Sequence, residues 1–138
     1  MADTTRNYKV TIAETSKELN KIERIAMKDV GDAFKLDEVL DSVPDDSFNI
    51  TISSYARLSV HNEMVRQGSS EDYELYVLID DEGKKYVTGS STFWSAFSEI
   101  ADEFEPSEIE KGELTIKIYR KPSKNFAGKY FITCSIVA

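Results

Sequence analysis

Three observations in this sequence predict a mainly β fold with a few helices. After residue 46, segments that alternate apolar and polar side chains recur, as half-buried strands do. One helical stripe of apolar side chains lies between the third and the fourth of these segments. The chain has 138 residues, 41% of them hydrophobic, so it can bury one core without disulfide bonds. We expect a helical N-terminal extension at residues 1–46, packed on a β domain at residues 47–138.

The first 46 residues contain signals for one helix and two ambiguous segments. Tyr8–Ala13 is compatible with a short strand or with an extended lead-in. The sequence TSKE at Thr15–Glu18 has the pattern of a capping box, and apolar residues follow it at helical spacing as far as Gly31. Lys35–Ser42 fits a helical turn or an extended piece, and the sequence PDD at 44–46 then ends the extension.

Three strands are expected next. Phe48–Val60 alternates, which places Ile50 and Ile52 on one face and Tyr55 on the other. A polar loop, HNEMVRQGSSED, leads to a second strand at Tyr73–Asp80. The sequence DDEGKK is typical of a hairpin turn, and YVT begins the third strand.

A helix and two further strands complete the predicted fold. GSST caps the helix, and Pro106 is expected to end it. Its apolar stripe consists of Phe93, Phe97, Ile100, Ala101 and Phe104. The strands ELTIKIYRK and KYFITCSIV follow, joined by the loop PSKNFAG. Five strands with a helix between the third and the fourth are the order of the OB-fold, a small Greek-key barrel. In that fold the ligand crosses strands two and three, between the loops that join strands one to two and four to five.

Charge is segregated along the chain, whose formal net charge is -8. Seven acidic residues lie within Glu99–Glu113, where Lys111 is the one basic residue. From Leu114 to the end there are five basic residues, no acidic ones, and several interleaved aromatic rings. Bases stack on aromatic faces while cations contact phosphates, so this pattern is typical of surfaces that bind single strands. The alternative is an ordinary solvated strand pair with exposed lysines.

We therefore expect unpaired nucleotides to contact the basic and aromatic side chains of the predicted barrel. The candidate DNA-binding residues are Tyr55, Arg57, Tyr76, Lys84, Tyr86, Lys117, Tyr119, Lys121, Lys124, Phe126, Lys129 and Phe131. Trp94 and Cys134 are instead predicted to belong to the core, because Trp94 lies beside the helix stripe and Cys134 alternates with apolar strand positions.

Catalysis is not expected from this sequence. The one histidine, His61, and the one cysteine, Cys134, form no credible catalytic pair, and neither zinc-ligand spacing nor a P-loop occurs. The sequence IDDEG lacks the alternating oxygen ligands of a calcium loop. We expect no enzyme activity, no metal and no cofactor. A single cysteine and the lack of a long apolar run favour a cytoplasmic protein without a membrane partner.

Two segments of the chain resemble the small single-stranded DNA-binding proteins of phages and mobile elements of Gram-positive bacteria. They are YVLIDDEGKKYVTGSSTFWSAFSEIADEF and IKIYRKPSKNFAGKYFITCSIV. FKLDEVLDSV and ARLSVHNE are also similar to that family, so the resemblance covers most of the chain from Phe34 onward. It implies an OB-fold protein that coats unwound DNA during replication or recombination in the host cytoplasm. Its implied partners are single-stranded DNA and other replication or recombination proteins.

A second hypothesis belongs to another class of protein. An acidic phage protein can bind and inhibit a host protein by mimicking DNA, and the net charge of -8 favours this reading. The basic, aromatic C-terminal stretch does not favour it. The sequence leaves open whether the nucleic acid is DNA or RNA and whether the chain is a monomer or a homodimer.

Overall fold

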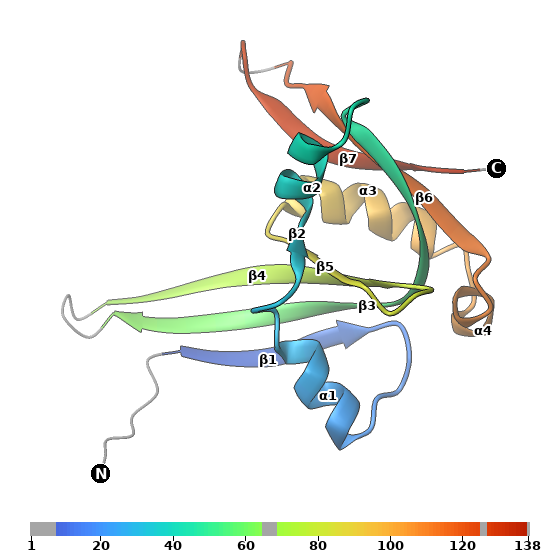
Figure 1. The fold of residues 1–138 in the computed structure, drawn as a ribbon. Helices are drawn as coiled ribbons and strands as arrows, with labels where there is room; N and C mark the ends of the chain where they lie inside the picture. The colour runs from blue at the N-terminus through green and yellow to red at the C-terminus, as the bar shows by residue number, and fades with distance from the viewer. Residues whose placement is uncertain (1–7, 65–68, 125–126, 138) are drawn as a thin grey trace.

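The computed structural model describes residues 8–64, 69–124 and 127–137 (Figure 1). Its strands are β1 (Tyr8–Thr15), β2 (Phe34–Lys35), β3 (Ser47–Met64), β4 (Ser69–Asp80), β5 (Lys85–Thr88), β6 (Leu114–Pro122) and β7 (Tyr130–Ile136). Its helices are α1 (Lys21–Lys28), α2 (Leu36–Ser42), α3 (Ser91–Ala101) and α4 (Pro106–Glu110). The prediction of a mainly β fold with helices is confirmed.

The strands form one curled, open sheet in the order β2-β5-β4-β3-β6-β7, and β1 pairs with β3. The long strand β3 is responsible for the curl: its residues 47–52 pair with β6, and its later residues pair with β4 and β1. Within the described residues β5 and β7 do not pair, so the half-barrel stays open. The sheet therefore differs from the predicted five-stranded barrel, because β1 and β2 of the N-terminal 46 residues also belong to it.

The segment His61–Asp72 is mostly strand and not the polar loop that its composition suggested. β3 continues to Met64, and β4 begins at Ser69. Residues 65–68 lie outside the described residues. Together β1, β3 and β4 form a ribbon that extends away from the rest of the molecule (Figure 1).

A β-bulge between Ile52 and Ser54 changes which face of β3 the following side chains occupy. An extra residue in one strand inverts the alternation beyond it. Tyr55 consequently lies in the same buried cluster as Ile50 and Ile52, while Leu58 lies in a second cluster on the other face. The expectation that Tyr55 faces away from Ile50 and Ile52 is wrong for this reason.

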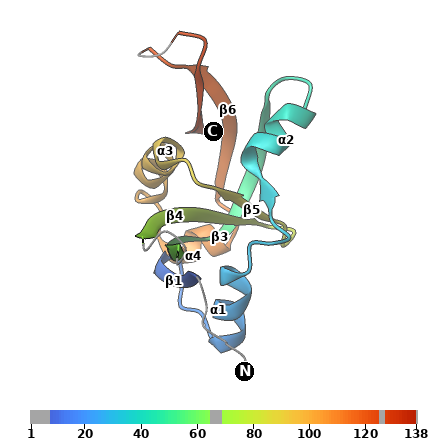
Figure 2. The ribbon, with the colours of Figure 1, turned by 90° about the vertical axis from the view of Figure 1, so that its left-hand side faces the viewer.

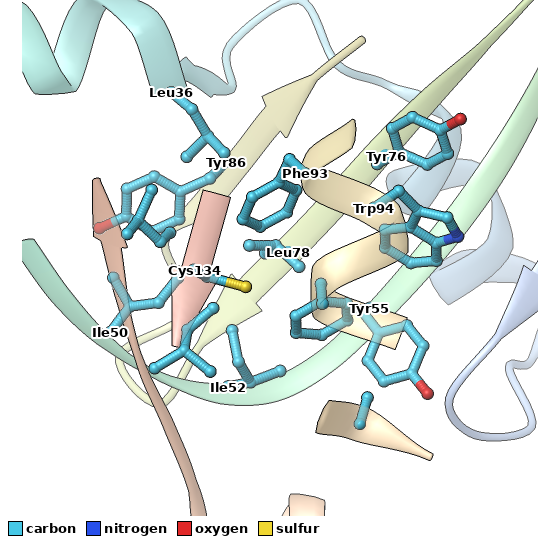
Figure 3. Packing of buried hydrophobic residues seen from close by; sticks show 14 of the residues in the cluster. Leu36, Ile50, Ile52, Tyr55, Tyr76, Leu78, Tyr86, Phe93, Trp94 and Cys134 are labelled. Atoms are coloured by element: carbon cyan, nitrogen blue, oxygen red, sulfur yellow. The ribbon is translucent and has the colours of Figure 1, made fainter. Parts of the chain in front are cut away.

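The larger cluster, called here the inner cluster, packs between α2, α3 and the curled strands (Figure 3). The stripe of α3 supplies Phe93 and Phe97, which are fully buried. Truncating such a ring to alanine costs about 3–5 kcal/mol. Trp94 and Cys134 also belong to the inner cluster, as predicted. Burial raises the pKa of the Cys134 thiol to about 12.

The smaller cluster, called here the outer cluster, lies on the opposite face of β3, β4 and β5. It joins Met27 of α1 to Ala56, Leu58, Val77 and Val87. Residues of β1 pack against it as well. The N-terminal segment therefore covers one face of the central strands.

Two helix boundaries differ from the predictions. Thr15 ends β1 and does not cap α1; the N-cap is Asn20, whose Oδ1 accepts from the Glu23 N–H at 2.8 Å. Pro106 does not end α3, which already finishes at Ala101. It occupies the first turn of α4, where a proline costs no hydrogen bond. In α3 the cap is Ser90, as expected, with its Oγ accepting from the Phe93 N–H at 3.1 Å.

Candidate nucleic-acid interface

Strands two and three of the predicted barrel are covered on both faces where they pair with each other. These strands are β4 and β5, and their inner face carries Tyr76 and Tyr86, which are 4% and 8% exposed. Their outer face carries Val77 and Val87, which pack against Met27 of α1. A ligand therefore finds no open groove across the paired part of these two strands, and that expectation is corrected.

Three of the predicted stacking rings have protein partners. The Tyr76 ring stacks on Trp94 with 4.8 Å between centroids (Figure 3). The Tyr55 ring meets Phe97 edge-on with 4.9 Å between centroids. The centroid of the Tyr86 ring lies 6.0 Å from the centroid of the Phe48 ring. Burial is the main cause that raises the pKa of each of these three tyrosines. They are core residues here and offer no free face to a base.

Arg57 and Lys84 lie apart from the other predicted cations. Arg57 Nη1 is 2.7 Å from Glu74 Oε2 and its Nε is 3.3 Å from Glu14 Oε1, so two carboxylates already neutralise this guanidinium. The hydrogen bond between Arg57 and Glu74 raises the pKa of the arginine and lowers the pKa of the glutamate. Lys84 is exposed in the β4–β5 turn, which lies well apart from the β6–β7 loop in both ribbon views (Figures 1 and 2).

The remaining described candidates come together on the hairpin of β6 and β7. Even-numbered residues of β6 from Leu114 to Ile118 point into the inner cluster, so Lys117, Tyr119 and Lys121 project from the other face. Tyr119 pairs with Thr133, and Lys121 pairs with Phe131 of β7. The Lys117 Nζ atom lies 5.7 Å from the centroid of the Tyr119 ring.

A hollow of about 1180 Å³ lies where the end of this hairpin approaches the beginning of α3. It is lined by Thr92, Lys121, Pro122, Ser123, Lys124, Lys129, Tyr130 and Phe131. The loop beside it is closed by a hydrogen bond from the Ser123 N–H to the Lys129 carbonyl oxygen at 2.8 Å, and Gly128 takes a left-handed φ of 78°. The prediction for Phe126 lies outside the described residues.

The charged side chains of the hairpin are all basic. The hairpin carries no acidic residue. Among the residues that the structure places, Arg120 is the one hairpin cation with a carboxylate partner. Its Nη1 atom is 2.9 Å from Asp41 Oδ1 of α2. Lys117, Lys121, Lys124 and Lys129 are all exposed. Four ammonium groups next to aromatic rings can contact phosphates and stacked bases together.

Sequence reasoning missed Tyr130, which is 65% exposed and lines the hollow. Alternation along β7 would place its side chain on the face of Ile132, which is buried. As the first residue of β7, Tyr130 lies beyond the region where the inner cluster covers that face. Its position directly after Lys129 in a basic, aromatic stretch was the available signal.

Comparison with protein-family models, with curated proteins and with solved structures finds no match to this chain. In the part of the chain that the structure places, no helix is both long and apolar enough to cross a bilayer. In the same residues no group of three His, Cys, Asp or Glu side chains is positioned to hold a metal ion. The functional interpretation therefore depends on the geometry and charge of the hairpin.

Proposed function

We propose that this protein binds single-stranded DNA, largely without sequence preference, through the β6–β7 hairpin and its hollow. One observation carries the proposal: four exposed lysines and the rings of Tyr119, Tyr130 and Phe131 share a hairpin that has no acidic residue. Among the described residues these lysines have no carboxylate partner, so they can contact phosphates without first breaking such an ion pair. Aromatic faces accept any unpaired base, which a duplex does not present.

The fold supports the same function if the curled sheet is an OB-type barrel. Strands β3 to β7 follow the OB order, with α3 between the third and the fourth, and β3 pairs with both β4 and β6. The hollow then lies at the loop between strands four and five, one of the two loops that contact ligands in this fold. Because α1 covers the face of strands two and three, we assign binding to the hairpin instead.

This binding would serve to coat unwound DNA during phage replication or recombination in the host cytoplasm. A second candidate is an acidic phage protein that binds a host protein in the manner of a DNA mimic. The seven acidic residues of Glu99–Glu113, on and beside α3 and α4, favour that candidate. The two candidates differ in which charges they use, so they can be separated by mutation.

Fluorescence anisotropy with labelled oligo-dT and with a duplex of equal length tests the proposal. We expect oligo-dT to bind and the duplex to bind more weakly. Replacing Lys121 and Lys124 by alanine should weaken oligo-dT binding, whereas Lys111→Ala, also exposed but next to α4, should not. Equal or tighter binding of the duplex, or equal effects of hairpin and control variants, contradicts the proposal.

A further inference from the structure

Helix α1 turns its isoleucines toward solvent. Ile22 is 75% exposed and Ile25 is 64% exposed, while Met27 is the residue of this helix that is buried. The orientation is held from two sides. Met27 packs in the outer cluster, and Lys85 Nζ of β5 donates to the carbonyl oxygens of Ala26 and of Asp29 at the end of the helix. The helix therefore cannot rotate to bury its isoleucines without losing these contacts.

A groove of about 630 Å³ lies beside the exposed helix face, between α1, the beginning of β1 and β4. Its apolar lining includes Val10, Ile25, Val30, Val60, Tyr73 and Leu75. Lys9, Lys28 and Asp29 lie at the same groove and are exposed. The groove thus presents apolar side chains together with two ammonium groups and one carboxylate.

The segment that supplies most of the groove lining has a small positive charge. Residues 9–31 contain five basic and four acidic residues in a chain whose net charge is -8. Three of these acids already have partners: Glu14 pairs with Arg57, the Glu23 carboxylate accepts from the Asn20 N–H at 3.0 Å, and the Asp29 carboxylate accepts from the Gly31 N–H at 3.2 Å. An occupant of this groove should therefore be acidic and carry apolar side chains.

The same chain supplies such a surface. The acidic corner, defined here as residues 99–113 at the end of α3 and in α4, has seven acids and one lysine. Glu99 and Glu103 are exposed there, next to the partly exposed Ile100 and Phe104. Among the residues that the structure describes, none of these acids is ion-paired with a cation. Figure 1 shows α4 and the beginning of β1 at opposite ends of the long sheet.

We propose that the α1 groove binds the acidic corner of a second copy of this chain. The two surfaces are different, so the contact is heterologous, and a pair formed in this way leaves one groove and one corner free. Copies then add head to tail, as an open chain or, where the rotation between copies closes, as a ring. The contact requires no nucleic acid, so it is independent of the proposed function.

Two variants at exposed positions isolate the two halves of the contact. The groove variant, Ile25→Asp, places a charge on the apolar floor and repels the acidic corner. The corner variant, Glu99→Gln with Glu103→Gln, removes acids without adding a positive charge that could bind the altered groove. Circular dichroism checks that both variants keep the fold of the parent.

Sedimentation velocity without DNA, over a wide range of concentration, gives the result. We expect the parent to form a series of dimers, trimers and longer species that shrinks as salt rises. Each variant alone should lose every species above the monomer. An equimolar mixture of the two should form a dimer and nothing longer. The intact corner of the groove variant binds the intact groove of the corner variant, and the two surfaces left free are the altered ones.

Three outcomes would overturn the proposal. A parent that stays monomeric at all concentrations means that the groove serves another partner or none. A corner variant that assembles like the parent means that α1 pairs with itself or with another surface. A mixture that grows beyond the dimer means that the two variants do not block the two ends.

Discussion

The ring of Tyr76 lies parallel to the indole of Trp94, with 4.8 Å between their centroids and 12° between their planes. This contact joins β4 to α3, and both side chains are nearly buried. A ring that sequence reasoning assigned to DNA is therefore already occupied by a ring of the protein.

Tyr76→Ala should lower the free energy of unfolding by about 3–5 kcal/mol, because it removes a buried ring and its stacking on Trp94. Tyr76→Phe keeps the ring and loses the hydrogen bond from the hydroxyl to Glu74 Oε1, which is 3.0 Å long. That change should cost only about 1 kcal/mol. Urea unfolding of both variants measures the difference. An alanine variant as stable as the parent would show that the stacked pair does not hold α3 on β4.

Alkaline pH should destabilise the protein. The ordinary thiol pKa of 9.0 is raised to about 12 in Cys134 by burial, and burial also raises the pKa of Tyr55, Tyr76 and Tyr86. The folded state then holds protons that the unfolded state releases, so stability is complete below pH 9 and falls as the pH rises toward 12. The urea midpoint should decrease over this range, and Cys134→Ala should make the decrease less steep. An identical slope in both proteins would contradict the assignment to the thiol.

Much of this fold follows from local sequence patterns. The stripe of α3, the alternation of β6 and the Gly83 turn depend on neighbouring residues, and the structure has all three. The bulge after Ile52 depends on pairing between distant strands, which no local pattern encodes. For the same reason the position of Tyr55 and the pairing of β1 with β3 could not be predicted.

Part of the candidate site could likewise be predicted from local sequence, and part of it could not. The run of lysines without acids was visible in the sequence, and the structure brings Lys121, Lys124 and Lys129 to one hollow. Which rings remain exposed depends on what packs on them. Trp94 covers Tyr76, whereas nothing in the inner cluster covers Tyr130.

Salt should weaken DNA binding in proportion to the number of lysines that contact phosphates. If the four exposed lysines of the hairpin all do so, log affinity against log salt should have a slope of roughly -3, at about -0.7 for each contact with a single strand. Lys117→Ala or Lys124→Ala should each reduce this slope by about 0.7. Lys111→Ala, outside the hairpin, is the matched control and should leave the slope unchanged. Equal slopes for all three variants and the parent would remove the hairpin lysines from the interface.

The exposed rings of the hairpin should contribute affinity without contributing much stability. Tyr130→Ala should weaken oligo-dT binding by about 1–3 kcal/mol, and by similar amounts for other base sequences, because stacking uses only the face of a base. Its ring is 65% exposed, so the melting temperature should hardly change. Tyr119→Ala tests the ring beside Lys117 in the same way.

Tyr130→Phe and Tyr119→Phe separate stacking from hydrogen bonding, because they keep the ring and remove the hydroxyl. We expect both phenylalanine variants to bind oligo-dT like the parent if the ring face is what the base contacts. Anisotropy and thermal unfolding are measured on the same preparations of all four variants. Alanine variants that bind like the parent, or that lose affinity only as far as they lose stability, would mean that this hairpin is an ordinary solvated sheet edge.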